Sequence, residues 1–235
     1  YFFSSSLTME SFQIDSDAGA SGIYYYYAGR QLRGMGKELD IGAQAVLDTF
    51  NKSRNLYFYK GRWFFSLIYT GKEPAPDMVE LATFLVRRVP GDSRRPDGFQ
   101  FLDVEGVGHN YARVTSGNAL NFDIFPPGVT AVAPGAGPRA AAYVIDLGDH
   151  DRAQDRARDF ERYLRVNAAE YHSQRRVFGK DGIDCRQALD GKHGKLVFAR
   201  YGRFIVVVAS VDDYQAGLEV LSRILEKMHT AKVKK

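Results

Sequence analysis

The chain contains one sequence pattern twice, and this repetition constrains its fold more than any other feature. Residues 56–69 read LYFYKGRWFFSLIY, and residues 196–209 read LVFARYGRFIVVVA. Each segment has two apolar runs on either side of a Gly-Arg pair, which is typical of a β-hairpin because glycine supplies the backbone angle of the turn. An aspartate follows each hairpin, Asp77 or Asp213, and predicts that a helix begins there. The repetition indicates a tandem duplication of one unit.

The order of the expected elements places the chain in the α+β class. We predict two tandem related units of mostly antiparallel sheet with helices packed on one face, an arrangement similar to ferredoxin-like folds. The units are expected at residues 1–90 and 140–230. A Pro-, Gly- and Arg-rich connection over 91–139 joins them, and a basic tail follows at 231–235.

The two copies are expected to differ near their starts. In the second copy, a strand over Ala141–Asp146 precedes a long amphipathic helix from Asp149 to Tyr171. In the first copy, a strand over Leu7–Ile14 precedes a glycine-rich segment, which is expected to form a short turn or one to two helical turns. The run Ile23–Tyr27 follows, and its aromatic composition is typical of a strand. The first copy is therefore predicted to lack the long helix.

Spacing suggests how a further segment of the two copies aligns. Ile41 and Leu47 are separated by the same number of residues as Ile183 and Leu189. We therefore expect Leu47 and Leu189 to occupy equivalent positions. Within the connection, short strands are expected over residues 99–104 and 119–125.

Composition narrows the function classes. The chain has 32 Lys and Arg against 28 Asp and Glu, for a formal net charge of +4, and the basic residues are interleaved with acidic ones. This pattern argues against nucleic acid as the main partner. The apolar run Phe204–Ala209, which no other run in the sequence exceeds in length, suits a buried strand and is far too short to cross a bilayer. No membrane-spanning segment is expected.

The sequence carries no recognisable catalytic or metal-binding motif. Its histidines are His109, His150, His172, His193 and His229, and none stands four residues from another. It has no Gly-x-Ser-x-Gly nucleophile motif, no phosphate-binding loop and no dinucleotide fingerprint. Cys185 is the single cysteine, which excludes a disulfide within this sequence and favours a small buried thiol. We therefore expect no catalytic residue, metal or cofactor, and the sequence favours a function other than catalysis.

Aromatic and arginine side chains are the candidates for partner binding, because these types are enriched at interface hot spots. The candidates are Tyr25, Tyr27, Arg62, Trp63, Arg94, Arg95 and Arg203. Turn chemistry also explains the two Gly-Arg pairs, and helix C-terminal charge explains part of the arginine cluster near residue 90. The first hypothesis is a non-catalytic binding or accessory domain that docks to a protein partner, either itself or a larger assembly. The alternative is a small-ligand-binding or enzymatic site in the cleft between the two repeats.

Parts of the first copy also resemble a known family. The run AGASGIY at residues 18–24, Ile41-Gly42, the hairpin segment at residues 58–64 and Leu81-Ala82 are together similar to a bacterial, exported family of domains of unknown function built of two such units. The resemblance implies a bacterial origin and favours a periplasmic or extracellular location, as part of an envelope assembly. It implies no catalytic residue.

Overall fold

The chain folds into two compact units, Tyr1–Pro96 and Asp97–Lys235. A computed structural model describes residues 5–14, 17–28, 36–48, 53–71, 76–108, 112–115, 117–178 and 181–231. The unit boundary lies near the start of the expected connection, so that residues 97–139 belong to the second unit. Most of the expected basic tail lies outside the described residues.

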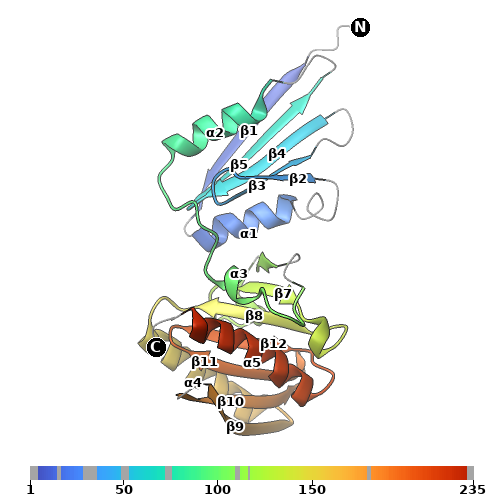
Figure 1. The fold of residues 1–235 in the computed structure, drawn as a ribbon, viewed down its shortest axis with the longest axis vertical. Helices are drawn as coiled ribbons and strands as arrows, with labels where there is room; N and C mark the ends of the chain where they lie inside the picture. Colours follow the sequence, from blue (N-terminus) through green and yellow to red (C-terminus); the bar gives the residue numbers. More distant parts are fainter. Residues whose placement is uncertain are drawn as a thin grey trace. The chain divides into compact units, whose positions relative to one another are not determined.

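The first unit is a five-stranded antiparallel sheet with two helices (Figure 1). Its elements are β1 (Ser6–Gln13), α1 (Asp17–Ala28), β2 (Gly36–Leu39), β3 (Gln44–Asp48), β4 (Ser53–Lys60), β5 (Trp63–Thr70) and α2 (Met78–Arg88). The strands lie in the order β1-β5-β4-β3-β2. The Asp77 carboxylate caps α2, as predicted, by accepting hydrogen bonds from the backbone N–H groups of Val79 and Glu80.

The second unit has a seven-stranded antiparallel sheet. Its elements are α3 (Gly98–Phe101), β6 (Arg113–Val114), η2 (Ala119–Asn121), β7 (Val129–Val132), η3 (Pro134–Ala136), β8 (Ala141–Asp146), α4 (His150–Asn167), β9 (Glu170–Phe178), β10 (Asp181–Asp190), β11 (Gly194–Tyr201), β12 (Phe204–Ala209) and α5 (Tyr214–Thr230). The strand order is β6-β7-β8-β12-β11-β10-β9. The described part of the segment before β8 therefore includes the short helix α3, the strands β6 and β7 and the 3₁₀ turns η2 and η3. The expected strands over 99–104 and 119–125 are wrong.

The two units share one order of elements, from β1 to α2 in the first and from β8 to α5 in the second. Five strands of the second sheet repeat the strand order of the first. Both predicted hairpins are present, and their turn glycines, Gly61 and Gly202, have φ values of 52° and 57°. The backbone N–H of Ile14 donates to the Arg62 carbonyl, and that of Leu147 donates to the Arg203 carbonyl. The α+β class with antiparallel sheets is confirmed, whereas the βαββββα order differs from the βαββαβ order of ferredoxin-like folds.

Helices cover both faces of each sheet, so the expectation of helices on one face is wrong. In β4, Leu56 and Phe58 pack in one cluster with Met78 of α2. Tyr57 and Tyr59 alternate with them and pack in the other cluster with α1. The second unit repeats this arrangement: α4 packs on the face of Phe198, and α5 packs on the face of Val197. The cause is that both faces of the central strands are apolar and each needs a cover.

The expected strand at Ile23–Tyr27 is wrong because these residues belong to α1. Ala20, Tyr24 and Ala28 are fully buried at four-residue spacing, as on one face of a helix. The first unit therefore has a counterpart of α4, and the predicted difference between the copies is reduced to one of helix length, 12 residues against 18. The helix expected to reach Tyr171 ends at Asn167, where β9 follows shortly after.

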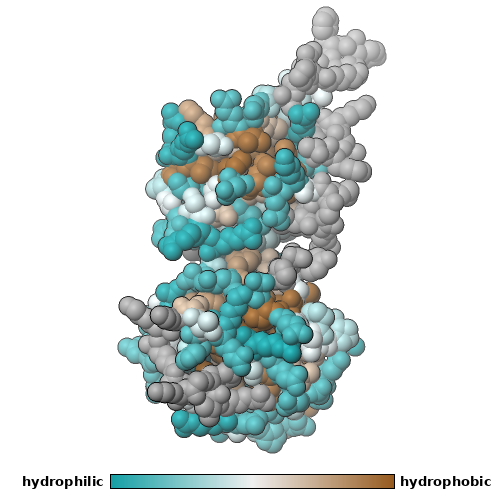
Figure 2. All heavy atoms as spheres, in the orientation of Figure 1, coloured by the Kyte–Doolittle hydropathy of each residue, from teal (hydrophilic) through white to brown (hydrophobic). Residues whose placement is uncertain are grey.

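The cover that α2 provides is incomplete. Its Leu81 and Leu85 are only half-buried, and Phe84 is 48% exposed. Figure 2 shows apolar surface beside α2 on the face drawn, among mostly hydrophilic residues. None of the described helices combines the length and apolar character needed to cross a membrane.

Candidate functional site

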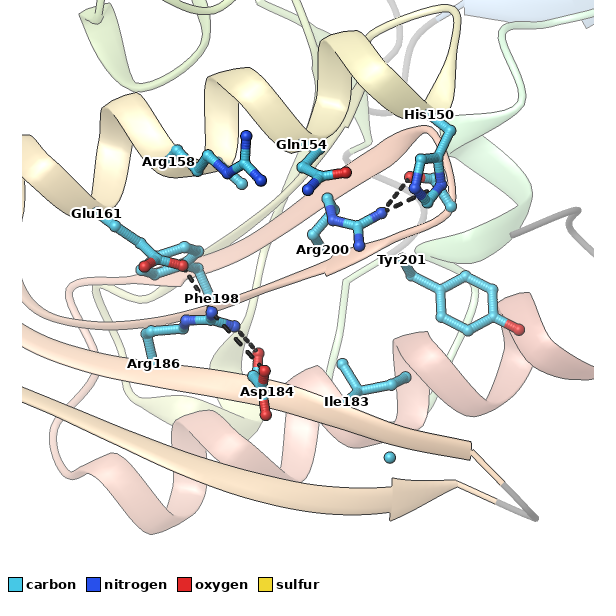
Figure 3. A pocket seen from close by; sticks show the side chains of 13 residues that line it. His150, Gln154, Arg158, Glu161, Ile183, Asp184, Arg186, Phe198, Arg200 and Tyr201 are labelled. Carbon is cyan, nitrogen blue, oxygen red and sulfur yellow. Dashed lines mark hydrogen bonds and ion pairs between the residues drawn. The ribbon is translucent and has the colours of Figure 1, made fainter.

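A groove in the second unit lies between α4 and the strands β10 and β11, with a volume of about 380 Å³ (Figure 3). Its lining residues are His150, Gln154, Ala157, Arg158, Glu161, Gly182, Ile183, Asp184, Arg186, Phe198, Arg200, Tyr201 and Gly202. Further along α4, Phe160 and Leu164 fill the space against the sheet. Near the helix start the buried residues are Ala153 and Ala157, whose small side chains leave room above the strands.

Arg186, on β10, forms ion pairs at one end of the groove. Its Nη2 lies 2.7 Å from a carboxylate oxygen of Glu161 and 3.9 Å from one of Asp184. The Arg186 and Glu161 side chains are each 20% exposed, so the pair is largely shielded from water. A shielded ion pair needs both partners, because removing one leaves a poorly solvated charge.

Arg200, on β11, has no carboxylate partner among the residues that the structure describes. Its Nη1 donates to the Gly202 carbonyl at 3.2 Å and lies 3.3 Å from Nδ1 of His150. A guanidinium only donates, so Nδ1 of the imidazole accepts. Burial lowers the pKa of Arg200 from its ordinary value, and the positive charges of Arg186 and Arg158 lower it further. Arginine nevertheless remains charged in proteins, so Arg200 keeps a positive charge in the groove.

The charges lining the groove sum to a positive excess. Both carboxylates in the lining, those of Glu161 and Asp184, form ion pairs with Arg186. Arg158 lies 3.6 Å from Asp155 in a pair that is 65% and 74% exposed, and such a pair neutralises little. Figure 3 shows Arg158 and Gln154 extending from α4 on the same side of the groove as Arg200. This side of the groove can therefore accept an anion.

Apolar side chains complete the groove. Ala157 of α4, Ile183 of β10, and Phe198 and Tyr201 of β11 line it. A cationic end beside an apolar surface suits an organic anion, whose charged group pairs with guanidinium while its apolar part contacts the rings.

In the first unit, tyrosines fill the equivalent space between α1 and the sheet. The hairpin registers make Tyr59 equivalent to Arg200, and Val46 equivalent to Arg186. The Tyr59 ring is 1% exposed in total and lies 5.3 Å from the ring of Tyr24. The same register makes Leu47 equivalent to Gln187, so the expected equivalence of Leu47 and Leu189 is wrong by two residues.

The predicted aromatic candidates all lie in the first unit. The Tyr25 hydroxyl donates to Oε1 of Gln44 at 2.6 Å, and burial raises the pKa of Tyr25. Tyr27 is 43% exposed, and its ring stacks on Phe64 with a centroid distance of 5.4 Å. Trp63 is half-buried against the cluster under α2. These rings serve packing within the unit, and their role in partner binding stays a prediction.

The predicted arginines lie at separate places. Arg62 is exposed at the first hairpin turn. Arg94 pairs with Asp92 at 2.7 Å, and Arg95 lies 3.7 Å from Glu38. In the second unit, Nη2 of Arg203 lies 2.9 Å from carboxylate oxygens of both Asp97 and Asp146. None of the seven predicted residues lines the groove.

A second polar cluster in this unit has a structural role. Nδ1 of His193 lies 2.7 Å from Oδ2 of Asp190, and Nε2 lies 2.8 Å from the carbonyl oxygen of Leu120. Both ring nitrogens thus lie within hydrogen-bond distance of an oxygen atom. Leu120 and Asn121 have φ values of 56° and 52°, a left-handed conformation that is strained for leucine and that asparagine adopts more readily. The histidine therefore holds a strained turn against the β10–β11 turn.

Among the described residues, no group of three His, Cys, Asp or Glu side chains is placed to hold a metal ion. Protein-family models, curated proteins and solved structures were all compared with the chain, and none of them matches it. The resemblance to an exported bacterial family therefore stays a prediction.

Proposed function

We propose that the second unit binds a small organic anion in the groove between α4 and the strands β10 and β11. The observation that carries this proposal is Arg200, a half-buried guanidinium whose described partners are a carbonyl oxygen and an imidazole nitrogen. A carboxylate or phosphate group would relieve the repulsion among Arg200, Arg158 and Arg186 and would form charge-assisted hydrogen bonds. The chemical class of ligand is an anionic group on an apolar body.

Binding is proposed here instead of a reaction because of the residues that line the groove. They include no serine, threonine or cysteine, which are the usual hydroxyl and thiol nucleophiles. The carboxylates of Glu161 and Asp184 are held by Arg186 at one end. The proposal thus takes up the small-ligand alternative from the sequence, with the ligand inside the second unit instead of between the two repeats. Docking to a protein partner stays a prediction.

Titration calorimetry with phenyl phosphate and benzoate, together with benzylamine as a cation of similar size, tests the proposal. Both anions should bind the wild-type chain and raise its unfolding temperature, whereas benzylamine should do neither. Arg200→Gln should weaken anion binding roughly 10- to 100-fold, the effect of losing a charged hydrogen bond of about 1.5–3 kcal/mol.

A matched control and an opposite variant sharpen the test. Arg152 is exposed on α4 outside the groove lining, so Arg152→Gln should bind both anions like wild type. Glu161→Gln frees Arg186 and should tighten anion binding. Equal binding of benzylamine, or an Arg200→Gln variant with unchanged affinity, would rule out the proposed site.

A further inference from the structure

Strand β1 is a long exposed edge of the first sheet. All eight residues from Ser6 to Gln13 are exposed. They include Leu7, Met9 and Phe12, which are 39%, 52% and 43% exposed. The strand pairs with β5 without interruption from Ser6 to Gln13, so no bulge twists it away. Among the described residues, no strand pairs with its other side.

The other sheet edges carry features that discourage pairing with another chain, and β1 does not. Strand β2 has four residues with Lys37 and Glu38 in its middle, and β6 has only two residues. The described part of β9 includes Glu170, His172 and Arg175. Proteins commonly protect edges by short length or by charge. In β1 the single charged residue is Glu10, and there is no proline.

In the second unit, a further strand pairs with the strand that is equivalent to β1. Strand β8 is equivalent to β1, because each lies next to the last strand of its hairpin. There, β7 covers the outer side of β8 in antiparallel register, from Val129 opposite Val144 to Val132 opposite Ala141. An antiparallel strand therefore fits at this position with helices on both faces of the sheet.

We propose that β1 pairs antiparallel with β1 of a second copy of this chain, which joins two five-stranded sheets across a two-fold axis. A two-fold pairing centred on Met9 places Leu7 opposite Ser11 of the second copy and Glu10 opposite Thr8. The two Glu10 carboxylates then avoid each other, whereas a pairing centred on Glu10 would oppose them directly. The pairing covers three exposed apolar side chains per copy and satisfies the free backbone groups of both edges.

Light scattering after size-exclusion chromatography and cysteine crosslinking test this dimer. The wild-type chain should elute as a dimer that dissociates on dilution. Under mild oxidation, Met9→Cys should form an intermolecular disulfide, because opposite residues of such a pair have Cβ atoms about 5 Å apart. Leu7→Cys alone should not crosslink, but a mixture of Leu7→Cys with Ser11→Cys should. The native Cys185 is fully buried and gives a low background.

A charge variant with a matched control separates edge pairing from general association. Met9→Lys should shift the chain to monomer without loss of its circular dichroism spectrum, because two opposed ammonium groups disfavour the pair. Ser173→Lys places the same charge on the exposed β9 edge and should remain dimeric. A wild-type chain that stays monomeric at the highest concentration reached overturns the proposal, and leaves a strand of another protein as the occupant of the edge. Disulfide formation by Leu7→Cys alone overturns the register.

Discussion

The two units place different side chains in the same space of one scaffold. Between the first helix and the sheet, the first unit packs Tyr24 and Tyr59, whereas the second has a groove at the equivalent position. The strands also differ in charge at equivalent positions: Arg200 stands where the first unit has Tyr59, and Arg186 where it has Val46. The same backbone topology therefore holds a packed core in one unit and a groove in the other, and a few side chains account for the difference.

The two units also differ at one edge of their sheets, and there the second unit is the more completely covered one. The second unit has an added segment, residues 97–139, that covers the edge strand β8. The first unit leaves β1 without such a cover among the described residues. The unit with the candidate ligand groove is thus the one in which a further strand covers this edge of the sheet.

The largest expected effect comes from moving the groove's charge into the first unit. Tyr59→Arg buries a guanidinium among tyrosines and should cost about 3–5 kcal/mol of unfolding free energy, measured by urea denaturation. The reverse change, Arg200→Tyr, fills the groove and should leave stability within about 1 kcal/mol while it abolishes anion binding. If Tyr59→Arg left the unfolding free energy unchanged, the space under α1 would not be the packed core described above.

Next in size is the contact that holds the added segment of the second unit. Asp190, 2% exposed, accepts from the His193 ring and from the backbone N–H groups of Lys192 and His193. Asp190→Asn should destabilise the chain by about 3 kcal/mol at neutral pH, because it removes the charged partner of a buried pair.

The same contact predicts a pH dependence. Burial opposes the charged form of Asp190, but the hydrogen bonds from His193 outweigh it and lower the pKa of this carboxyl. A lowered folded pKa gives stability that is fully present above the ordinary value of about 3.9 and is lost as the pH falls through the folded pKa. The gap between wild type and Asp190→Asn in urea denaturation should therefore narrow below about pH 4. A gap that stays constant down to the folded pKa would contradict this account.

The hairpin glycines allow a comparison of intermediate size. Gly61→Ala and Gly202→Ala both place a Cβ at positive φ, at a cost of about 1–2 kcal/mol. At position 61, the Cβ of the alanine variant would also lie 2.8 Å from the Cα of Gly91, so it would collide with the backbone there. Thermal unfolding should therefore show a larger loss of stability for Gly61→Ala than for Gly202→Ala. Equal losses would mean that the backbone around Gly91 shifts to make room for the added Cβ.

The smallest effect concerns the two turn arginines. Arg203 lies 2.9 Å from both Asp97 and Asp146, whereas the position equivalent to Asp146 is Gln13 in the first unit. Arg203→Gln should cost up to about 1 kcal/mol, since the pairs are partly exposed, and Arg62→Gln should stay within about 0.5 kcal/mol. A double-mutant cycle of Arg203→Gln with Asp146→Asn measures the coupling, which should vanish if the pair is only incidental.

Local signals in the sequence predicted the elements whose residues intrinsically favour the secondary structure that they adopt in the fold. The two hairpins follow from a glycine between apolar runs, and the helix starts at Asp77, Asp149 and Asp213 follow from capping. The tyrosine helix α1 could not be predicted this way, because aromatic side chains favour strands and glycines disfavour helices, and burial against β4 overrides both preferences.

The candidate groove could not be predicted from the sequence for a different reason. Arg158, Arg186 and Arg200 come from three separate elements, and each alone resembles an ordinary surface arginine. An alignment of the two copies at the level of strand register would have revealed arginine in place of Val46 and Tyr59. The spacing of Leu47 and Leu189 suggests a register shifted by two residues, which hides this correspondence.

The way β7 covers β8 determines where the second unit can be cut. A fragment that starts at residue 140, where the sequence repeat begins, would lose β6 and β7 and expose β8, whose Ala142, Val144 and Ile145 are at most 1% exposed in the whole chain. A bare, apolar strand of this kind is a template for aggregation. A fragment that starts at Asp97 keeps its own cover, so the piece that a dissection must preserve is larger than the repeat itself.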